Sequence, residues 1–295
     1  MPPVPWRAYA LLAASTSLIG SYVGLSKLLV AAFPIFLLAG MRFAIAAVMM
    51  AGWLKKPADE APLDSRAKGL LFLESFLGNF LFSICMLFGL KLSSALVAGV
   101  IMAGIPAAVA LLSRVFLRER LGGRVLAGIA CAVGGIALVA ALRHGDGETS
   151  PLGALLLLGA VLCEGSYVVI GKSLTARLGP KRISALVNLW GLALVTPLAL
   201  WQARDFDFAG VQPLHWGLLL YYAAAASIFT VWLWMSGLRH VPASRAGVFM
   251  VFLPVSTALM GLALGEQMSG LHALAYGLAL LGVLLATWPA RSSAR

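Results

Sequence analysis

Long apolar runs separated by short polar breaks follow one another along almost the whole chain of 295 residues. A helix needs ~20 consecutive apolar residues to cross the hydrocarbon core of a bilayer. Only 11% of the residues are charged, whereas a soluble domain carries ~25% charged residues to keep its surface hydrated. This composition excludes a soluble enzyme, a disordered chain, a collagen and a disulfide scaffold. The chain is therefore predicted to be an all-α integral membrane protein.

The apolar runs predict ten transmembrane helices. Their expected ranges are 8–30, 34–54, 69–90, 93–113, 124–142, 151–172, 181–201, 214–236, 243–264 and 269–288. The connections between them are too short to form a folded domain outside the membrane. The first run is interpreted as an uncleaved span, because its apolar part is longer than that of a signal peptide and its basic flank is only Arg7.

Basic residues are distributed unevenly between the two sides of the predicted spans. The N-terminus, the even-numbered connections and the C-terminus hold 17 of the 22 Lys and Arg residues, and the odd-numbered connections hold four. Cytoplasmic loops carry the excess of Lys and Arg in membrane proteins. Both termini are therefore predicted to be cytoplasmic. The net charge of +11 indicates orientation in the membrane and not nucleic-acid binding.

An internal repeat divides the chain into residues 1–143 and 144–295. The segment AGVIMAGIP at 98–106 recurs as AGVFMVFLP at 246–254, and Gly-Leu-Lys at 89–91 recurs as Gly-Leu-Arg at 237–239. Each half holds five predicted spans, and because five is odd the second half enters the membrane from the opposite side. Inverted repeats of this kind are the build of many secondary transporters, which work by alternating access.

Several motifs in these repeats resemble a known family. Each copy has a proline in its fourth span, an L-x-E-x segment (117–120 in the first copy) and a Gly-rich fifth span, and the second span contains Arg42 in MRFAIA. This pattern resembles the drug/metabolite transporter (DMT) superfamily, EamA type. The length, the ten spans and the cytoplasmic termini are similar to the bacterial aromatic amino acid exporters. The resemblance implies a multi-pass protein of the bacterial inner (plasma) membrane that exports aromatic and other hydrophobic amino acids.

The paired prolines predict a mechanical feature. A proline within a helix has no N–H, so Pro106 and Pro254 would free the carbonyls of Met102 and Met250. One interpretation is a pair of hinges near the middle of the membrane, whose methionines line an adaptable apolar cavity. The alternative is a kink that neighbouring helices stabilise.

A polar stripe and one aromatic residue are further candidates for substrate binding. Ser75, Asn79 and Ser83 follow one another at intervals of four in the third span, and Ser227 is equivalent to Asn79 in the second repeat. Such side chains either join helices or meet a substrate. Trp190 lies in the middle of its span, where packing is the other explanation. The expected substrate-binding residues are Asn79, Ser83, Met102, Glu164, Trp190, Ser227 and Met250.

Ionisable residues inside the spans are costly in lipid and are expected to pair or to line a cavity. Arg42, Glu74 and Glu164 are the three candidates for charge pairing or coupling, with Glu74 close enough to the cytoplasmic end to reach the interface. Arg42 either pairs with one of the two glutamates or meets a substrate carboxylate. Glu119 and Glu266 are expected to stabilise the start of the helix that follows each of them.

No enzyme or metal-binding motif is present in the sequence. No cofactor is expected, and Cys85, Cys131 and Cys163 are interpreted as reduced structural residues. The expected partners are a small-molecule substrate and the lipid bilayer, without nucleic acid, and a monomer is expected to be functional. Two other functions remain open, namely a drug or nucleotide-sugar carrier of the same fold and an intramembrane enzyme that modifies lipids.

Overall fold

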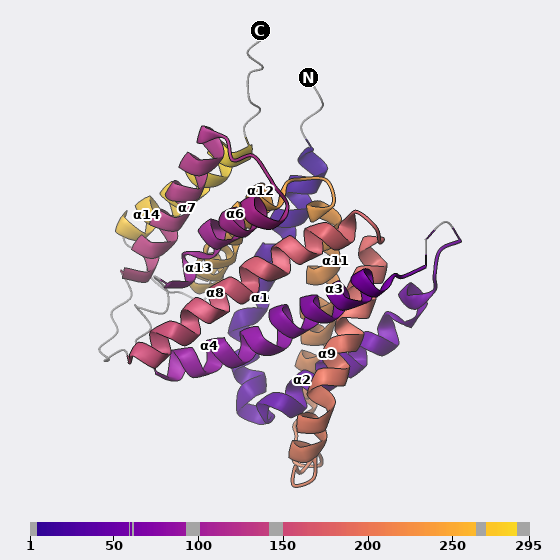
Figure 1. The fold of residues 1–295 in the computed structure, drawn as a ribbon. Helices are drawn as coiled ribbons and strands as arrows, with labels where there is room; N and C mark the ends of the chain where they lie inside the picture. The colour runs from indigo at the N-terminus through magenta and orange to yellow at the C-terminus, as the bar shows by residue number, and fades with distance from the viewer. Residues whose placement is uncertain are drawn as a thin grey trace.

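The computed structural model describes residues 5–58, 60, 62–92, 101–141, 150–263 and 270–287, and every regular element in these ranges is helical (Figure 1). The α-helices are α1 (Trp6–Ala32), α2 (Ile35–Met49), α3 (Ser65–Ser75), α4 (Phe82–Lys91), α6 (Ile105–Phe116), α7 (Gly123–Ala141), α8 (Pro151–Thr175), α9 (Pro180–Ala203), α10 (Pro213–Tyr222), α11 (Thr230–Leu238), α12 (Ala243–Val248), α13 (Phe252–Ala263) and α14 (Gly270–Thr287). Two 3₁₀ segments are η1 (Ala51–Leu54) and η4 (Phe249–Val251), and two π-helical segments are η2 (Phe76–Leu81) and η3 (Ala223–Phe229).

Many of these helices are long and apolar. Within the described ranges, five stretches are long and apolar enough to cross a membrane: Ser65–Met86, Pro151–Thr175, Pro180–Ala203, Pro213–Leu238 and Gly270–Thr287. Four apolar helices are shorter: Ile35–Met49, Ile105–Phe116, Gly123–Leu138 and Ala243–Ser256. The prediction of an all-α membrane protein is confirmed for the part of the chain that the structure describes.

Local sequence explains where several helices begin. α8, α9 and α10 each have a proline in the first turn, where the missing N–H costs nothing and the fixed φ suits a helix. Ser150 also caps α8, because its Oγ accepts a hydrogen bond from the Gly153 N–H at 3.0 Å. These starts lie within one residue of the predicted spans.

Two predicted spans contain a π-helical turn at equivalent positions of the repeat. η2 joins α3 to α4, and η3 joins α10 to α11. Hydrogen bonds in a π-turn run from residue i to i+5, so the regular ladder of an α-helix is interrupted there. Asn79 lies in η2 and Ser227 in η3. Both polar candidates therefore lie where the backbone departs from a regular α-helix.

The two proline-containing spans are interrupted in different ways. A turn at residues 103–104 precedes α6, so Pro106 lies in the first turn of a new helix, and the prediction that it lies in the middle of a continuous helix is wrong. Pro254 lies in α13, which follows α12 and η4 without a gap, so the second span is a continuous helical stretch with one 3₁₀ segment. A proline is tolerated in a first turn, because the N–H groups there have no intrahelical partner. The missing N–H of Pro106 is thus accommodated by a helix that ends at Met102 and restarts at Ile105.

The principal helix pairs cross between the two halves of the sequence. α1 packs against α11 and α13, whereas α8 packs against α4 and α6. α2 pairs with α9, and α7 pairs with α14 at one edge of the molecule (Figure 1). Because each half supplies helices to the other, neither half covers its own apolar surface alone.

α7 and α14 approach until their backbones touch. A Cβ atom added to Gly128 would lie 2.6 Å from the carbonyl oxygen of Gly282, and one added to Gly135 would lie 2.6 Å from the backbone nitrogen of Ala279. Small residues permit this approach, which favours van der Waals packing between membrane helices. The glycines of the two fifth spans thus have a structural role in joining the halves.

We expect Gly135→Ala to lower the melting temperature of the detergent-solubilised protein, since the new methyl group would also lie 2.7 Å from the Ala275 carbonyl oxygen. Overpacking costs ~1–3 kcal/mol. Gly134→Ala is the matched control, because its Cβ would lie 3.8 Å from Leu278 Cδ2 and alanine favours a helix over glycine by ~1 kcal/mol. Equal losses in both variants, measured by thermal unfolding, would contradict the close approach.

Candidate functional site

Arg42 lies in α2 and binds the π-helical segment of the other half. Its Nη1 donates a hydrogen bond to Ser227 Oγ at 3.1 Å. Its guanidinium lies 4.2 Å from the centroid of the Phe43 ring and 5.6 Å from that of the Tyr222 ring, where the ring faces stabilise a cation. The structure thus brings together two of the predicted site residues, Arg42 and Ser227. A planar guanidinium carries further N–H donors, which suit a carboxylate.

Asn188 in α9 completes this group, and sequence reasoning missed it. Its Nδ2 donates to the backbone carbonyl of Ser227 at 2.9 Å and to that of Ser184 at 2.8 Å. Asn188 is buried, so its amide satisfies a carbonyl in the π-turn that water does not reach. The available signal was a single amide inside an apolar run of α9.

The predicted polar stripe divides into separate roles. Ser75 Oγ donates to the Val187 carbonyl of α9 at 2.9 Å, which makes it a contact between helices. Ser83 Oγ donates to the Asn79 carbonyl at 2.5 Å, within its own helix. Asn79 is half-buried, and its Nδ2 donates to Ser75 Oγ at 3.4 Å. Val187 and Asn188 are neighbours in α9. One turn of α9 therefore forms hydrogen bonds both with Ser75, next to η2, and with Ser227 in η3.

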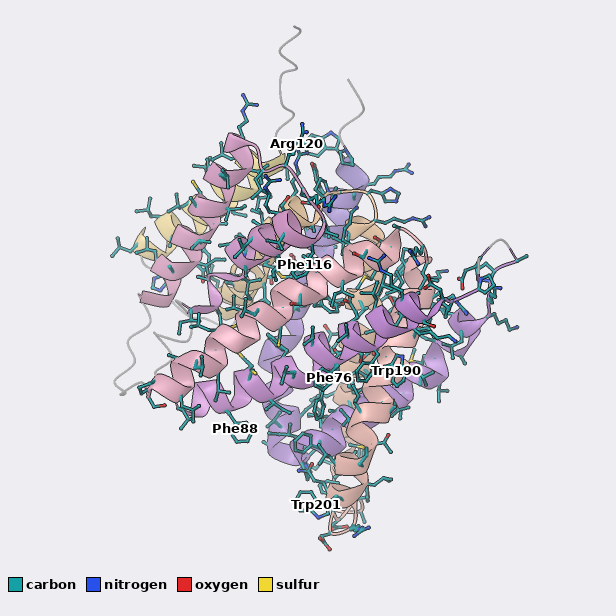
Figure 2. All side chains as sticks on the ribbon, in the orientation of Figure 1. Phe76, Phe88, Phe116, Arg120, Trp190 and Trp201 are labelled. Atoms are coloured by element: carbon teal, nitrogen blue, oxygen red, sulfur yellow. The ribbon has the colours of Figure 1, made fainter. Side chains whose placement is uncertain are left out.

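Trp190 belongs to a row of aromatic rings. Its ring meets the edge of Phe72 at a centroid distance of 5.3 Å, and Phe72 stacks on Phe76 at 5.7 Å. Trp190 remains 40% exposed, and Figure 2 shows it beside Phe76 where α9 crosses α3. The adjacent Gly191 packs against Phe43 of α2. Trp190 therefore packs on α3, on a different side of α9 from the contact with α2.

Met102 and Met250 lie at the two helix breaks. Met102 is the last helical residue before the turn at 103–104, and Met250 is the middle residue of η4. Both side chains are half-buried. Thr16 of α1 holds the second break, because its Oγ1 donates to the Phe249 carbonyl at 3.0 Å. The methionines thus occupy equivalent places at the two interruptions.

Glu74, which lies close enough to the predicted cytoplasmic end to reach the interface, is completely buried within the protein. Its exposed fraction is 0%, and neither carboxylate oxygen has a hydrogen-bond partner among the described residues. It lies beneath Gly171 of α8, where an added Cβ would be 2.8 Å from Glu74 Oε1. The nearby Lys172 Nζ instead donates to the carbonyls of Leu238 and Arg239 at 2.9 and 3.1 Å. Lys172, the residue after Gly171, therefore caps the C-terminal end of α11 and is not paired with Glu74.

Glu164 is half-buried on α8. It precedes Gly171 by seven residues, so it lies two turns away on the same face of the helix. Arg177–Asp64 and Arg182–Glu60 are ion pairs among the described residues, and neither includes Arg42, Glu74 or Glu164. The hypothesis that Arg42 is the counter-ion of Glu74 or Glu164 therefore finds no support in this conformation.

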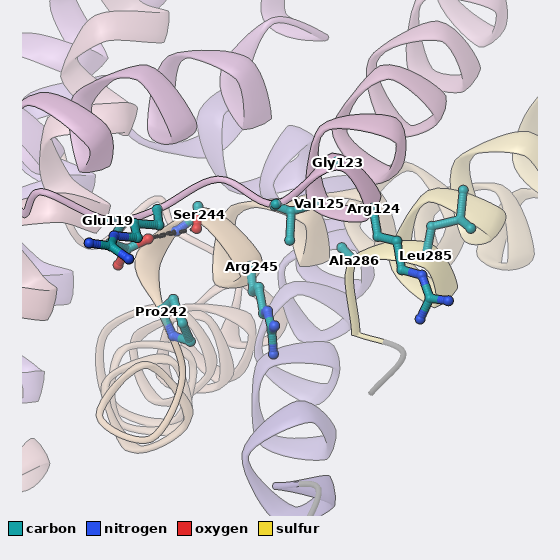
Figure 3. A pocket seen from close by; sticks show the side chains of 11 residues that line it. Glu119, Gly123, Arg124, Val125, Pro242, Ser244, Arg245, Leu285 and Ala286 are labelled. Carbon is teal, nitrogen blue, oxygen red and sulfur yellow. Dashed lines mark hydrogen bonds between the residues drawn. The ribbon is translucent and has the colours of Figure 1, made fainter. Parts of the chain in front are cut away.

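Glu119 stabilises a helix N-terminus, but not that of the helix that follows it. Its carboxylate accepts hydrogen bonds from the N–H of Ala243 at 2.7 Å, the N–H of Ser244 at 3.1 Å and Ser244 Oγ at 2.6 Å (Figure 3). These groups open α12, in the second half of the chain. Arg118, the residue before Glu119, takes a left-handed conformation, with φ 56°, after the end of α6. The equivalent Glu266 lies outside the described residues.

One exposed carboxylate joins the connection before α3 to the end of α8. Asp64 Oδ1 accepts a hydrogen bond from the Ala67 N–H at 2.7 Å, and Oδ2 pairs with Arg177 Nη1 at 2.8 Å. The hydrogen bond from Ala67, followed by that from Arg177, lowers the pKa of Asp64 below its usual value. Both contacts favour the charged form of this capping residue.

The described part of the chain is built of apolar helices from two interleaved halves, with interrupted helices in both, as in many secondary transporters. The model of the EamA-like transporter family matches residues 6–141 and 151–288. The chain belongs to this family, within the DMT superfamily, so the resemblance found in the sequence is confirmed and membrane transport is its class of function.

Two relatives from Bacillus subtilis (strain 168) match most of the chain. The uncharacterized transporter YetK is 34% identical over 270 residues, 90% of this chain and 82% of YetK. The uncharacterized transporter YyaM is 24% identical over 286 residues, 95% of this chain and 93% of YyaM. A solved crystal structure aligns with a TM-score of 0.74 at 20% identity, covering 94% of this chain and 95% of that chain, which supports the fold.

We expect Glu119→Ala to lower the melting temperature, because three donors at the start of α12 lose their acceptor. Loss of a helix cap costs ~0.5–2 kcal/mol. Ser244→Ala removes only the hydroxyl contact and should cost less, and Glu119→Gln, which keeps one acceptor oxygen, should fall between. Thermal unfolding in which Glu119→Ala matches the wild type would show that the cap does not stabilise the fold.

Proposed function

We propose that the protein exports small organic metabolites by alternating access, and that aromatic and other hydrophobic amino acids are its substrates. The observation that carries this proposal is the paired set of helix interruptions, η2 with η3 and the turn at 103–104 with η4. Inverted repeats with interrupted helices supply two conformations of similar energy that open to opposite sides. The proposal includes ten spans in two inverted five-helix repeats, residues 1–143 and 144–295.

Both termini are proposed to be cytoplasmic. Gly237, near the end of α11, packs against Ala8 near the start of α1. Ala286, near the end of α14, lines the same cavity as Pro242 and Arg120. The beginning of α1 and the end of α14 thus lie on one side of the molecule, together with Arg120 and its neighbours, and the excess of basic residues favours the cytoplasm for that side.

The proposed substrate contacts follow from the polar group between α2, η2 and η3. The N–H donors of Arg42 that remain after its bond to Ser227 would bind the substrate carboxylate. The half-buried amide of Asn79 would accept from the substrate ammonium. Met102 and Met250, at the breaks, would supply adaptable apolar contacts for a side chain of variable shape. A nucleotide sugar would require several cations in the cavity, and Arg42 is the basic residue at this depth.

We expect liposomes that contain the purified protein to release labelled Phe, Trp and Met faster than empty liposomes do. Arg42→Ala should reduce this flux about tenfold or more, because a charge-assisted hydrogen bond is worth ~1.5–3 kcal/mol. Arg204→Ala is the control, since Arg204 is exposed in the connection after α9. Flux equal to that of empty liposomes would exclude amino acid export, and equal effects of both substitutions would exclude Arg42 as the carboxylate site.

Glu74 is proposed as the residue that couples export to protons. An ionised carboxylate without a partner is costly inside a membrane protein, so the arrangement around Gly171 suits a Glu74 that carries a proton. Release of that proton would require α3 to move away from α8 and α11. Glu164, which faces the same region from α8, and Lys172, which caps α11, are the other ionisable groups beside it.

We expect Glu74→Gln to abolish substrate accumulation driven by a proton gradient, while exchange of labelled for unlabelled substrate continues. Glutamine fills the same space and has no proton to release. Glu164→Gln is the control and should keep a response to the gradient. Gradient-driven accumulation that persists in Glu74→Gln would assign this residue a packing role, and wild-type flux that ignores the gradient would indicate facilitated efflux.

A further inference from the structure

A cavity of about 380 Å³ opens where the end of α14 meets the starts of α7 and α12 (Figure 3). Its basic lining residues are Arg120, from the connection before α7, Arg124, from the first turn of α7, and Arg245 of α12. Figure 3 shows the Arg124 and Arg245 side chains extending to the same side of the cavity. The first two are close in sequence, and tertiary packing brings Arg245 to the same cavity.

Basic side chains outnumber acidic ones among the lining residues that the structure describes. Glu119 is the acidic residue among them, and its carboxylate already accepts three hydrogen bonds from Ala243 and Ser244. Open space surrounds Gly122 and Gly123, where an added Cβ would meet nothing within 4 Å. A ligand can therefore approach the backbone at the start of α7, whose N–H groups also favour an anion.

Part of the cavity lining is apolar. Val125, Leu285 and Ala286 contribute to it, from α7 and α14. The same two helices continue into an apolar surface, on which Leu126 is 50% exposed and Leu284 is 55% exposed. A ligand that fits both the basic and the apolar lining has an anionic head and hydrocarbon chains.

We propose that this cavity binds the phosphate of an anionic phospholipid, whose acyl chains lie along α7 and α14. Basic pockets between membrane helices bind anionic head groups by this combination of charge and hydrocarbon contact. The bound phosphate would join Arg120 of the first half to Arg245 of the second, beside the Glu119 cap. The lipid would therefore stabilise the same junction between halves that Glu119 stabilises. This site is separate from the proposed substrate contacts at Arg42.

The experiment compares the melting temperature of the purified full chain in detergent with added phosphatidylglycerol, phosphatidylcholine or inorganic phosphate, and counts bound lipids by native mass spectrometry. We expect phosphatidylglycerol alone to raise the melting temperature and to remain bound. Arg120→Gln with Arg245→Gln should weaken its apparent affinity about tenfold or more. Arg7→Gln with Arg114→Gln, which removes equal charge from exposed positions, should leave that affinity unchanged.

Each other outcome overturns the proposal in a different way. A shift with inorganic phosphate at the same concentration would indicate a site for a free anion. A shift with phosphatidylcholine would indicate bulk hydrocarbon contact. Equal losses in the two double variants would indicate a diffuse effect of surface charge. Arg120→Gln alone serves if the double variant does not fold, because Arg120 is exposed and its loss should still weaken phosphatidylglycerol binding.

Discussion

Hydrocarbon offers no hydrogen-bonding solvent, so each backbone N–H and C=O within a membrane must find a partner in the protein. Regular helices meet this requirement by themselves, whereas the irregular segments depend on other helices. Thr16 of α1 donates to the Phe249 carbonyl in η4, and Asn188 of α9 donates to the Ser227 carbonyl in η3. An irregular segment held in this way can change its geometry only together with the helix that holds it. These contacts therefore link local backbone changes to movements of whole helices.

The two halves of the chain also depend on each other for their packing. α1 packs against helices of the second half and α8 against helices of the first, while Glu119 caps α12 across the junction. The backbones of α7 and α14 touch at Gly128 and Gly282. A methyl group added at such a contact has no space, so this pair is suited to remain fixed while other helices move. In the proposed alternating access, the segments before α6 and α13 would be the better candidates for movement, because a turn and a 3₁₀ segment interrupt the regular α-helical ladder there.

Hydropathy predicted the helical class and the positions of the long apolar helices that the structure describes, because the length of an apolar run is set by the thickness of the membrane. It gave the depth of Arg42 and Glu74 but not the direction in which each side chain points. The partner of Arg42 proved to be Ser227 and not a glutamate, and Glu119 proved to cap a helix about 124 residues away in sequence. Contacts of this kind depend on how each helix is rotated and on which helices pack together. The hydropathy of a single span does not determine either of these. The role of Asn188 depends on a π-turn in another helix, so its own sequence position carried little signal.

Arg42 and Glu74, two of the three charges predicted inside the spans, have different surroundings, and this difference bears on mechanism. Arg42 has a hydroxyl acceptor and two aromatic faces, which stabilise a cation without neutralising it. Glu74 lies elsewhere, beneath Gly171, with no partner among the residues described. If Arg42 meets the substrate carboxylate, Glu74 is not in direct competition with the substrate. A proton on Glu74 would then act on transport through the position of α3. This helix continues into η2, which holds Asn79, one of the proposed substrate contacts together with Arg42.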